Sequence, residues 1–444
     1  MKRLLAVMAA ACTLLSMTPP SVHSQVPRAG GAIDYAPSRM CGGCHDEIVD
    51  QQVQSEHETS FTNPLFQAQY FQEVLPNTAN DPALIEEAQL CIACHAPIAY
   101  KKTRGHVTRP DQVDPSTSGV TCDFCHTISG YLGKIPQNGN FISEPSEMKL
   151  GPFRHKSTWH HVYAELQTKS EVCAICHNAV NHHGLEIKST YTEWKGSRYA
   201  REGIQCQDCH MTVYGFLTGG KATYGSGQAA HMTLGTAPDR SRLYTHRFPG
   251  AHSKTQVKGA ITLDIDTGRT SASPGDEIAV RVLIDNERTG HKMPSGSADL
   301  RQLWLDLQAD IGGKRISIPA GPARRTDAHD VVGGGSFDQL LLGQDIPKGS
   351  RIYRAIFVDE TGKPTLSSYD AVEVVFDNRL DAGEIREERY HLTVPADARG
   401  TLRLQASLNY LPYPSSFSRR LGLGMAESVE VASTQKSLSI RRGP

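Results

Sequence analysis

The chain has 444 residues, with 46 Lys and Arg against 47 Asp and Glu. This balance excludes a basic nucleic-acid-binding protein and an acidic tail. A 39% hydrophobic content with 39 Gly is that of a globular protein and excludes a disordered chain. The 11 Cys all lie at or before Cys209, and most of the 19 His lie at or before His252. Composition therefore divides the chain near residue 255.

Residues 1–24 have the pattern of a cleaved secretory signal. Lys2 and Arg3 precede an apolar run over residues 4–17, and small residues around Ser24 follow. The run is short for a membrane span, although a retained anchor is the alternative. We expect export to the periplasm, or to the extracellular or outer surface, with no stable membrane insertion. Removal of the signal also removes Cys12 and leaves ten Cys.

The ten remaining cysteines form five C-x-x-C-H units, the signature of c-type haem attachment. Two thiols three positions apart lie on one side of a helical turn, where each can bond one haem vinyl group, and the next His supplies the proximal iron ligand. Zinc is disfavoured because it takes two Cys pairs per site and leaves the five histidines unexplained. The predicted cofactor is five covalent haem c groups. The units are Cys41/Cys44/His45, Cys91/Cys94/His95, Cys122/Cys125/His126, Cys173/Cys176/His177 and Cys206/Cys209/His210.

The first cysteines of these units alternate long and short spacings, at positions 41, 91, 122, 173 and 206. This alternation suggests a duplicated two-haem module, in which haems 2 and 3 and haems 4 and 5 form close pairs. At this haem density we expect short helices and long loops over residues 25–255. Residues 46–57, 84–90 and 157–166 are the predicted helical pieces.

A second axial His makes a haem a closed electron carrier, whereas an open position can bind substrate. If residues 46–57 form one helix, His57 lies too far from His45 to bind the same iron and should reach a neighbouring haem. His155, His161, His182, His183 and His231 are further possibilities, and Met211, Met232 and Met293 are expected to pack rather than bind iron. The candidate distal ligands are His57, His106, His160, His246, His252 and His291.

The second half, residues 256–444, has the period-two alternation of β-strands. Runs near residues 278–284, 303–307, 372–376 and 402–410 alternate apolar and polar residues between Pro-, Gly- and Asp-containing turns. They predict an antiparallel, Ig-like β-sandwich of seven to nine strands. Its loop GHKMPSG, which contains His291, is the place where it could meet the haem chemistry.

With these motifs the chain resembles the exported multihaem c-type cytochromes, with a cytochrome c-554-like haem domain. The resemblance rests on MCGGCHDEIVDQQVQSEH, SGVTCDFCHTISG and CAICHNAVNHHGLEIKSTYTEWKGSRYAREGIQCQDCHM. In similar proteins a β-sandwich with a GHxxP(T/S)G loop follows the haem domain, which implies that His291 is a distal ligand. The chain lacks the CxxCK motif of pentahaem nitrite reductase, which argues against that activity.

The leading hypothesis is an electron-transfer protein with mostly bis-His haems. Its expected partners are redox proteins, either other cytochromes or a membrane quinol-linked complex, and not nucleic acid. The alternative is an oxidoreductase in which one open haem acts on a small nitrogen or sulfur compound. In that case Arg154, Lys195, Tyr199 or Arg201 could stabilise an anionic intermediate. A weaker third hypothesis makes the sandwich an adhesion or assembly module.

Overall fold

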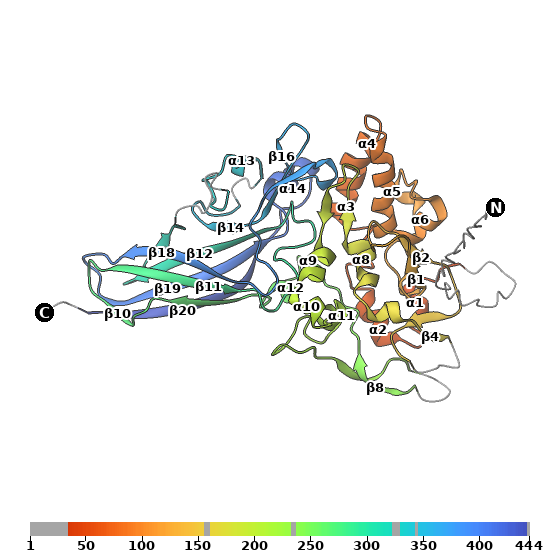
Figure 1. Cartoon of the computed structure of the whole chain (residues 1–444), viewed down its shortest axis with the longest axis horizontal. Helices are drawn as coiled ribbons and strands as arrows, with labels where there is room; N and C mark the ends of the chain where they lie inside the picture. Colours follow the sequence, from red (N-terminus) through yellow and green to blue (C-terminus); the bar gives the residue numbers. More distant parts are fainter. Residues whose placement is uncertain (1–33, 155–159, 232–236, 322–328, 342–344, 442–444) are drawn as a thin grey trace, which may run out of the picture. The chain divides into compact units, whose positions relative to one another are not determined.

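A computed structural model of the chain describes residues 34–154, 160–231, 237–321, 329–341 and 345–441 (Figure 1). Residues 34–444 belong to one compact unit. The predicted signal peptide, Cys12, His155 and Met232 lie outside the described residues.

In the described part of the chain, no helix is both long enough and apolar enough to cross a membrane.

The N-terminal half consists of short helices joined by loops, as predicted. The longest is α5 (Ala83–His95), which ends where Pro97 begins α6 (Pro97–Thr103). Asn63 caps α3 (Pro64–Ala68) by accepting hydrogen bonds from the Leu65 and Phe66 amides. The other helices are α1 (Ser38–Cys41), α2 (Asp46–Gln52), η1 (Gln69–Val74), α4 (Leu75–Asn77), η2 (Pro110–Gln112), η3 (Pro115–Thr117), α7 (Cys122–Cys125), η4 (Glu165–Thr168), α8 (Glu171–His177), α9 (Thr190–Gly196), α10 (Arg198–Arg201), α11 (Gln207–His210) and α12 (Lys254–Val257).

Two of the three predicted helical pieces needed correction. Residues 84–90 lie within α5, but α2 ends at Gln52, so His57 is not on the same helix as Asp46. The third prediction, a helix over residues 157–166, was wrong where the structure describes it. There β4 (His161–Tyr163) pairs in parallel with β3 (Lys149–Gly151), because the His-Val-Tyr sequence has β-branched and aromatic residues that suit a strand.

Other short strand pairs stiffen the loops of this half. They are β1 (Ile128–Tyr131) with β2 (Phe141–Ser143), β5 (Ala179–Val180) with β6 (Glu186–Lys188), and β7 (Gly225–Gln228) with β8 (Asp239–Leu243).

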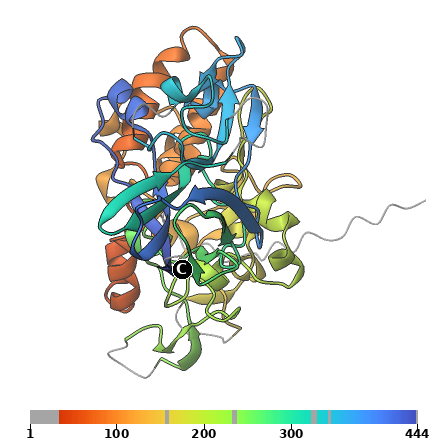
Figure 2. The ribbon, with the colours of Figure 1, turned by 90° about the vertical axis from the view of Figure 1, so that its left-hand side faces the viewer.

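The C-terminal half is rich in antiparallel strands arranged in several sheets (Figure 2). One sheet has the order β18 (Ile385–Thr393), β11 (Glu277–Asp285), β9 (Thr262–Asp266). A second has the order β10 (Ser271–Ala272), β20 (Val429–Ile440), β19 (Gly400–Leu411), β12 (Gln302–Ile311), β13 (Lys314–Ile318), with β14 (Arg351–Tyr353) also on β12. A third has the order β16 (Pro364–Thr365), β15 (Ala355–Val358), β17 (Glu373–Asp377). Helices α13 (Asp338–Leu341) and α14 (Ser415–Leu421) lie between strands of the second sheet, and η5 (Ser368–Asp370) lies between strands of the third.

Alternating residues of the first two sheets share one hydrophobic core. Ile278, Val280, Val282 and Ile284 of β11 are fully buried together with the apolar residues of β12 and β19. This confirms the alternation predicted for the long strands. The described residues contain twelve strands, β9 to β20, rather than seven to nine. Two- and three-residue strands such as β10 and β14 are too short to show a period-two pattern.

The shared core predicts a sharp contrast between two neighbouring positions of β19. Leu404 is fully buried in the core, whereas Arg403 is exposed. We expect Leu404→Ala to cost about 2–5 kcal/mol of unfolding free energy, since it removes apolar contacts and leaves a cavity. Arg403→Ala should change the unfolding free energy by less than about 0.5 kcal/mol. Thermal unfolding of the two variants, measured side by side, checks this, and equal melting temperatures would contradict the shared core.

Candidate functional site

Each C-x-x-C-H unit is wrapped into a single helical turn. The His45 amide donates to the Cys41 carbonyl, and His126 and His210 make the same bond to Cys122 and Cys206, each at 2.9 Å. The second and fourth units form the last turns of α5 and α8. Two thiols and one imidazole therefore leave the same turn, as covalent attachment of haem requires.

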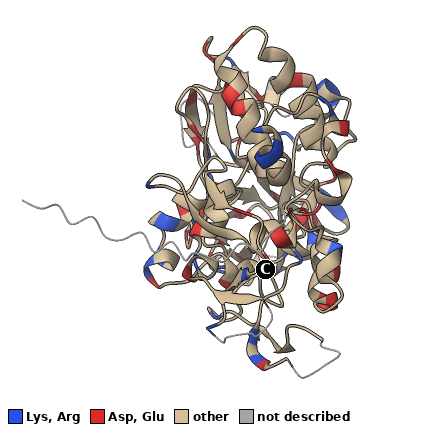
Figure 3. Ribbon diagram, turned by 90° about the vertical axis from the view of Figure 1, so that its right-hand side faces the viewer, with Lys and Arg blue, Asp and Glu red and all other residues tan. Residues whose placement is uncertain are grey.

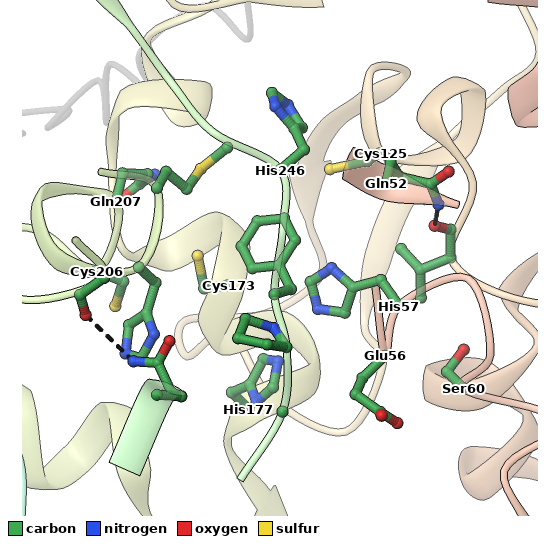
Figure 4. A pocket seen from close by; sticks show the side chains of 18 of the residues that line it. Gln52, Glu56, His57, Ser60, Cys125, Cys173, His177, Cys206, Gln207 and His246 are labelled. Carbon is green, nitrogen blue, oxygen red and sulfur yellow. Dashed lines mark hydrogen bonds between the residues drawn. The ribbon is translucent and has the colours of Figure 1, made fainter. Parts of the chain in front are cut away.

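The five units open into one continuous cavity of about 1710 Å³. Its lining includes the histidines of all five units and nine of their ten cysteines. A pocket for one small ligand is typically about 300–1,000 Å³, so this space is larger than a single ligand needs. None of the ten described cysteines forms a disulfide. Figure 4 shows His57, His177 and His246 entering the cavity from different segments of the chain.

Four unit histidines face a second imidazole across this cavity. An iron held by two imidazole nitrogens at about 2 Å each, with ring centres roughly 1 Å behind the nitrogens, separates the ring centres by about 6 Å. The four observed separations have this value, so the side chains fit bis-His haem. The pairs are His45–His160 at 5.9 Å, His57–His177 at 6.1 Å, His126–His246 at 6.2 Å and His210–His291 at 6.4 Å.

Hydrogen bonds orient several of these rings with Nε2 left for a metal. The Nδ1 atom of His45 lies 2.7 Å from the Ala229 carbonyl, and that of His126 lies 2.6 Å from the Leu150 carbonyl. On the distal side, His291 Nδ1 lies 2.7 Å from the Lys292 carbonyl. His95 and His246 make corresponding contacts with the carbonyls of Ser60 and Tyr244. A carbonyl on Nδ1 fixes the tautomer in iron-ligating histidines.

Burial keeps three of the facing imidazoles neutral. Desolvation, followed by the neighbouring imidazoles, lowers the pKa of His57 to about 3. Desolvation lowers the pKa of His246 to about 3 and that of His210 to about 4. Because iron binds the neutral imidazole, these side chains are in the ligating form at neutral pH.

His57 is positioned by a close backbone approach. The Val120 amide donates to the His57 carbonyl at 2.8 Å. Gly119 lies so close to the carbonyls of His57 and Glu58 that a Cβ at this position would overlap them. The glycine therefore lets the segment before the third unit hold His57 opposite His177, which belongs to the fourth unit.

The second unit differs from the other four. Phe66 stacks flat on the His95 ring, with 3.9 Å between ring centres and 11° between planes. This contact covers a face of the imidazole and does not span an iron, because a ligand pair needs about 6 Å. Among the described residues, no ring contact pairs His95 with a second histidine across the cavity. Lys188 lies close enough to lower the pKa of both His95 and His177, after the larger effect of burial.

Two of the six candidate distal ligands are not in imidazole pairs. His106 is exposed beside Gln89 and is not part of the cavity lining. His252 lines the cavity, but its Nε2 lies 3.0 Å from the Glu56 carboxylate. The remaining described possibilities have other contacts: His161 with the Phe153 carbonyl, His182 with Glu87, His183 with Glu360, and His231 with Asp46. Met293 is buried in the core of the C-terminal half, and Met211 lines the cavity.

The units lie close to one another at their cysteines. Cys41 neighbours Cys122, Cys94 neighbours Cys176, and Cys173 neighbours Cys206. These cysteines bring together units 1 and 3, units 2 and 4, and units 4 and 5. Of the two close pairs predicted from spacing, units 4 and 5 have neighbouring cysteines. Units 2 and 3 instead share an apolar cluster with unit 4, built from Ala93, Phe124 and Ile175.

The cationic and phenolic residues proposed for an anion site have other contacts. The Tyr199 hydroxyl donates to the Glu287 carbonyl, and Lys195 pairs with Glu171. Arg201 donates to the Gly196 carbonyl, and Arg154 lies over the Tyr163 ring. Sequence reasoning missed Phe66, Lys188 and Glu193, since no motif marks them. The GHKMPSG loop was the sequence feature that predicted contact between the two halves of the chain.

Comparisons with known proteins identify similar folds. Residues 40–127 match the family described as cytochrome c554 and c-prime. A penta-haem cytochrome c552 from Thermochromatium tepidum matches with a TM-score of 0.62 and 21% identity, covering 91% of this chain and 99% of its own. The sporulation control protein Spo0M from Bacillus subtilis matches with a TM-score of only 0.17 and 12% identity, covering 42% of this chain and 51% of its own. No curated protein matches the chain. The chain therefore has the fold of a multihaem c-type cytochrome, with a cytochrome c554-type segment at residues 40–127.

Proposed function

We propose that the protein is an exported electron carrier with five covalently bound c-type haems, four of them bis-His. The observation that supports this most strongly is the set of four imidazole pairs separated by 5.9–6.4 Å in one cavity. Five C-x-x-C-H units supply the attachment points. The similar cytochrome c552 is itself described as penta-haem.

In this proposal the axial ligands come from distant segments. His45, His126, His177 and His210 are proximal, and His160, His246, His57 and His291 respectively are distal. Haem c supplies one-electron redox chemistry at fixed positions. The protein supplies two neutral imidazoles for each of these four irons, and closing both axial positions favours electron transfer over substrate binding.

The neighbouring cysteines of the units support a route with a branch. Units 1 and 3 are in contact, and unit 4 contacts both unit 2 and unit 5. Units 3 and 4 meet in the apolar cluster of Phe124 and Ile175. We propose that electrons pass along units 1, 3, 4 and 5, with unit 2 as a branch at unit 4.

We propose that redox proteins dock at the first unit. Cys44 is the exposed member of the described cysteines, so the haem edge at this unit lies nearest to solvent. Positions of basic and acidic residues are interspersed along the ribbon in Figure 3, which suits transient contacts with another cytochrome or a membrane quinol-linked complex. The predicted signal at residues 1–24 supports a periplasmic, extracellular or outer-surface location.

A second candidate function is favoured by the second unit. His95 has Phe66 on its ring face, and its Nδ1 is occupied by the Ser60 carbonyl. An iron on His95 would keep one axial position free for a small nitrogen or sulfur compound. Lys188, which lines the same cavity, would favour an anionic substrate there. In this version the bis-His units feed electrons to an oxidoreductase site.

Covalent attachment is tested by mass spectrometry of the full chain, produced with haem-attachment machinery. We expect the mature mass plus five haems. Replacing Cys206 and Cys209 by Ala should remove one haem, because that unit loses both thioether positions. Cys12→Ala is the matched control and should leave all five haems, since Cys12 leaves with the signal. A wild-type count other than five would contradict the proposal.

Axial ligation is tested by electron paramagnetic resonance of the oxidised protein and carbon monoxide binding to the reduced protein. Wild type should show four low-spin haems and bind one carbon monoxide, at the second unit. His57→Ala and His246→Ala should each convert one low-spin haem to high-spin and add one bound carbon monoxide. The exposed His106→Ala is the control and should match wild type.

The same measurements separate the two candidate functions. If wild type binds no carbon monoxide, the oxidoreductase candidate fails and the carrier stands. If His57→Ala and His246→Ala leave the spectrum unchanged, the assigned ligand pairs are wrong.

A further inference from the structure

The distal partner of His210 comes from the C-terminal half. His291 lies in the loop of residues 290–296, which follows β11 and precedes β12. Its ring is nearly parallel to that of His210, with 8° between planes and 6.4 Å between centres. His291 does not lie on a helix or strand. Other residues must therefore hold it in place against the N-terminal half.

Glu193 of α9 holds the loop in place through hydrogen bonds. Its side chain is only 5% exposed, and each carboxylate oxygen has two donors. Oε2 accepts from the Lys292 amide at 3.2 Å and from the Ser295 hydroxyl at 2.7 Å. Oε1 accepts from the Ser189 hydroxyl at 2.7 Å and from Arg379 at 2.8 Å. The carboxylate thus bonds the residue directly after His291 and one further along the same loop.

Arg379 completes the contact from the other side. Its guanidinium is 6% exposed and donates to Glu193 and to the Pro294 carbonyl at 3.1 Å. It also makes a two-point contact with the Asp377 carboxylate, at 3.0 and 2.9 Å. Asp377 in turn pairs with Lys292 Nζ at 3.0 Å. The loop is therefore enclosed between one acid from the N-terminal half and one base from the C-terminal half.

Glu193 is charged in this setting. Burial works to raise the pKa of Glu193, but the charge of Arg379, together with the Ser295 and Ser189 hydroxyl donors, outweighs burial and holds that pKa below its usual range. A buried carboxylate with four satisfied bonds is a rigid anchor, whereas loss of one partner leaves the other buried and unpaired. Two further contacts support the loop: Thr190 bonds Ser295 at 2.8 Å, and Lys188 bonds Ser297 at 2.9 Å.

We propose that Glu193 and Arg379 are positioning residues that hold His291 opposite His210, so that ligation of the fifth haem depends on contact between the two halves of the chain. This inference rests on the proposed His210–His291 pair. It gives the C-terminal half a role in the redox chemistry, because that half supplies the second axial ligand of one haem.

The test compares variants of the full, haem-loaded chain. Glu193→Gln keeps every proposed ligand but weakens the anchor, and we expect one more carbon monoxide bound per reduced chain than in wild type, with a matching rise in high-spin signal. His291→Ala should give the same increase. Glu202→Gln, an exposed acid on the same half, is the matched control and should leave both readouts unchanged.

Each outcome decides a different claim. If His291→Ala adds a carbon monoxide site and Glu193→Gln does not, the positioning role is overturned while the ligand pair stands. If His291→Ala adds none, the proposed pair itself fails. A purely structural role for Glu193 would lower the melting temperature without adding a site. If Glu193→Gln does not fold, Ser295→Ala removes a single bond to Glu193, and it should speed carbon monoxide binding at one haem; an unchanged rate would overturn the proposal.

Discussion

The pairing of imidazoles about 6 Å apart is the arrangement on which the rest of the structure depends, and we propose that each pair holds one haem iron. Four such pairs lie in one cavity, and each joins segments that are distant in sequence. Short helices suffice here, because each needs only one turn to present two thiols and an imidazole. Burial of the rings excludes water. It also keeps the imidazoles of His57 and His246 neutral, which is the form that binds iron.

The two halves of the chain have different kinds of hydrophobic core. The C-terminal half buries alternating side chains between sheets and has an ordinary hydrophobic core. The N-terminal half has several smaller clusters placed around the cavity instead. The Glu193–Arg379 ion pair joins them beside His291. A buried ion pair is weak evidence for added stability, but it specifies one geometry, which is what a ligand loop requires.

Local patterns in the sequence were sufficient to predict part of this structure. The C-x-x-C-H units and the alternating strands are short-range features, and β11, β12 and β19 lie where alternation predicted them. The pairing of the imidazoles is long-range: His57 follows the first unit but faces the histidine of the fourth. No local rule separates His160 from His106, because only the fold decides which one enters the cavity. The prediction of a helix over residues 157–166 was wrong for a related reason. Pairing with β3, a separate segment of the chain, decides the conformation of β4.

The central claim is that four irons sit between paired imidazoles and that His95 is the proximal ligand of the fifth. A crystal structure of the haem-loaded chain, with iron located by anomalous scattering, tests it most directly. The account predicts five iron positions, four of them between His45 and His160, His57 and His177, His126 and His246, and His210 and His291. Fewer than five irons, or different partners for these histidines, would contradict it.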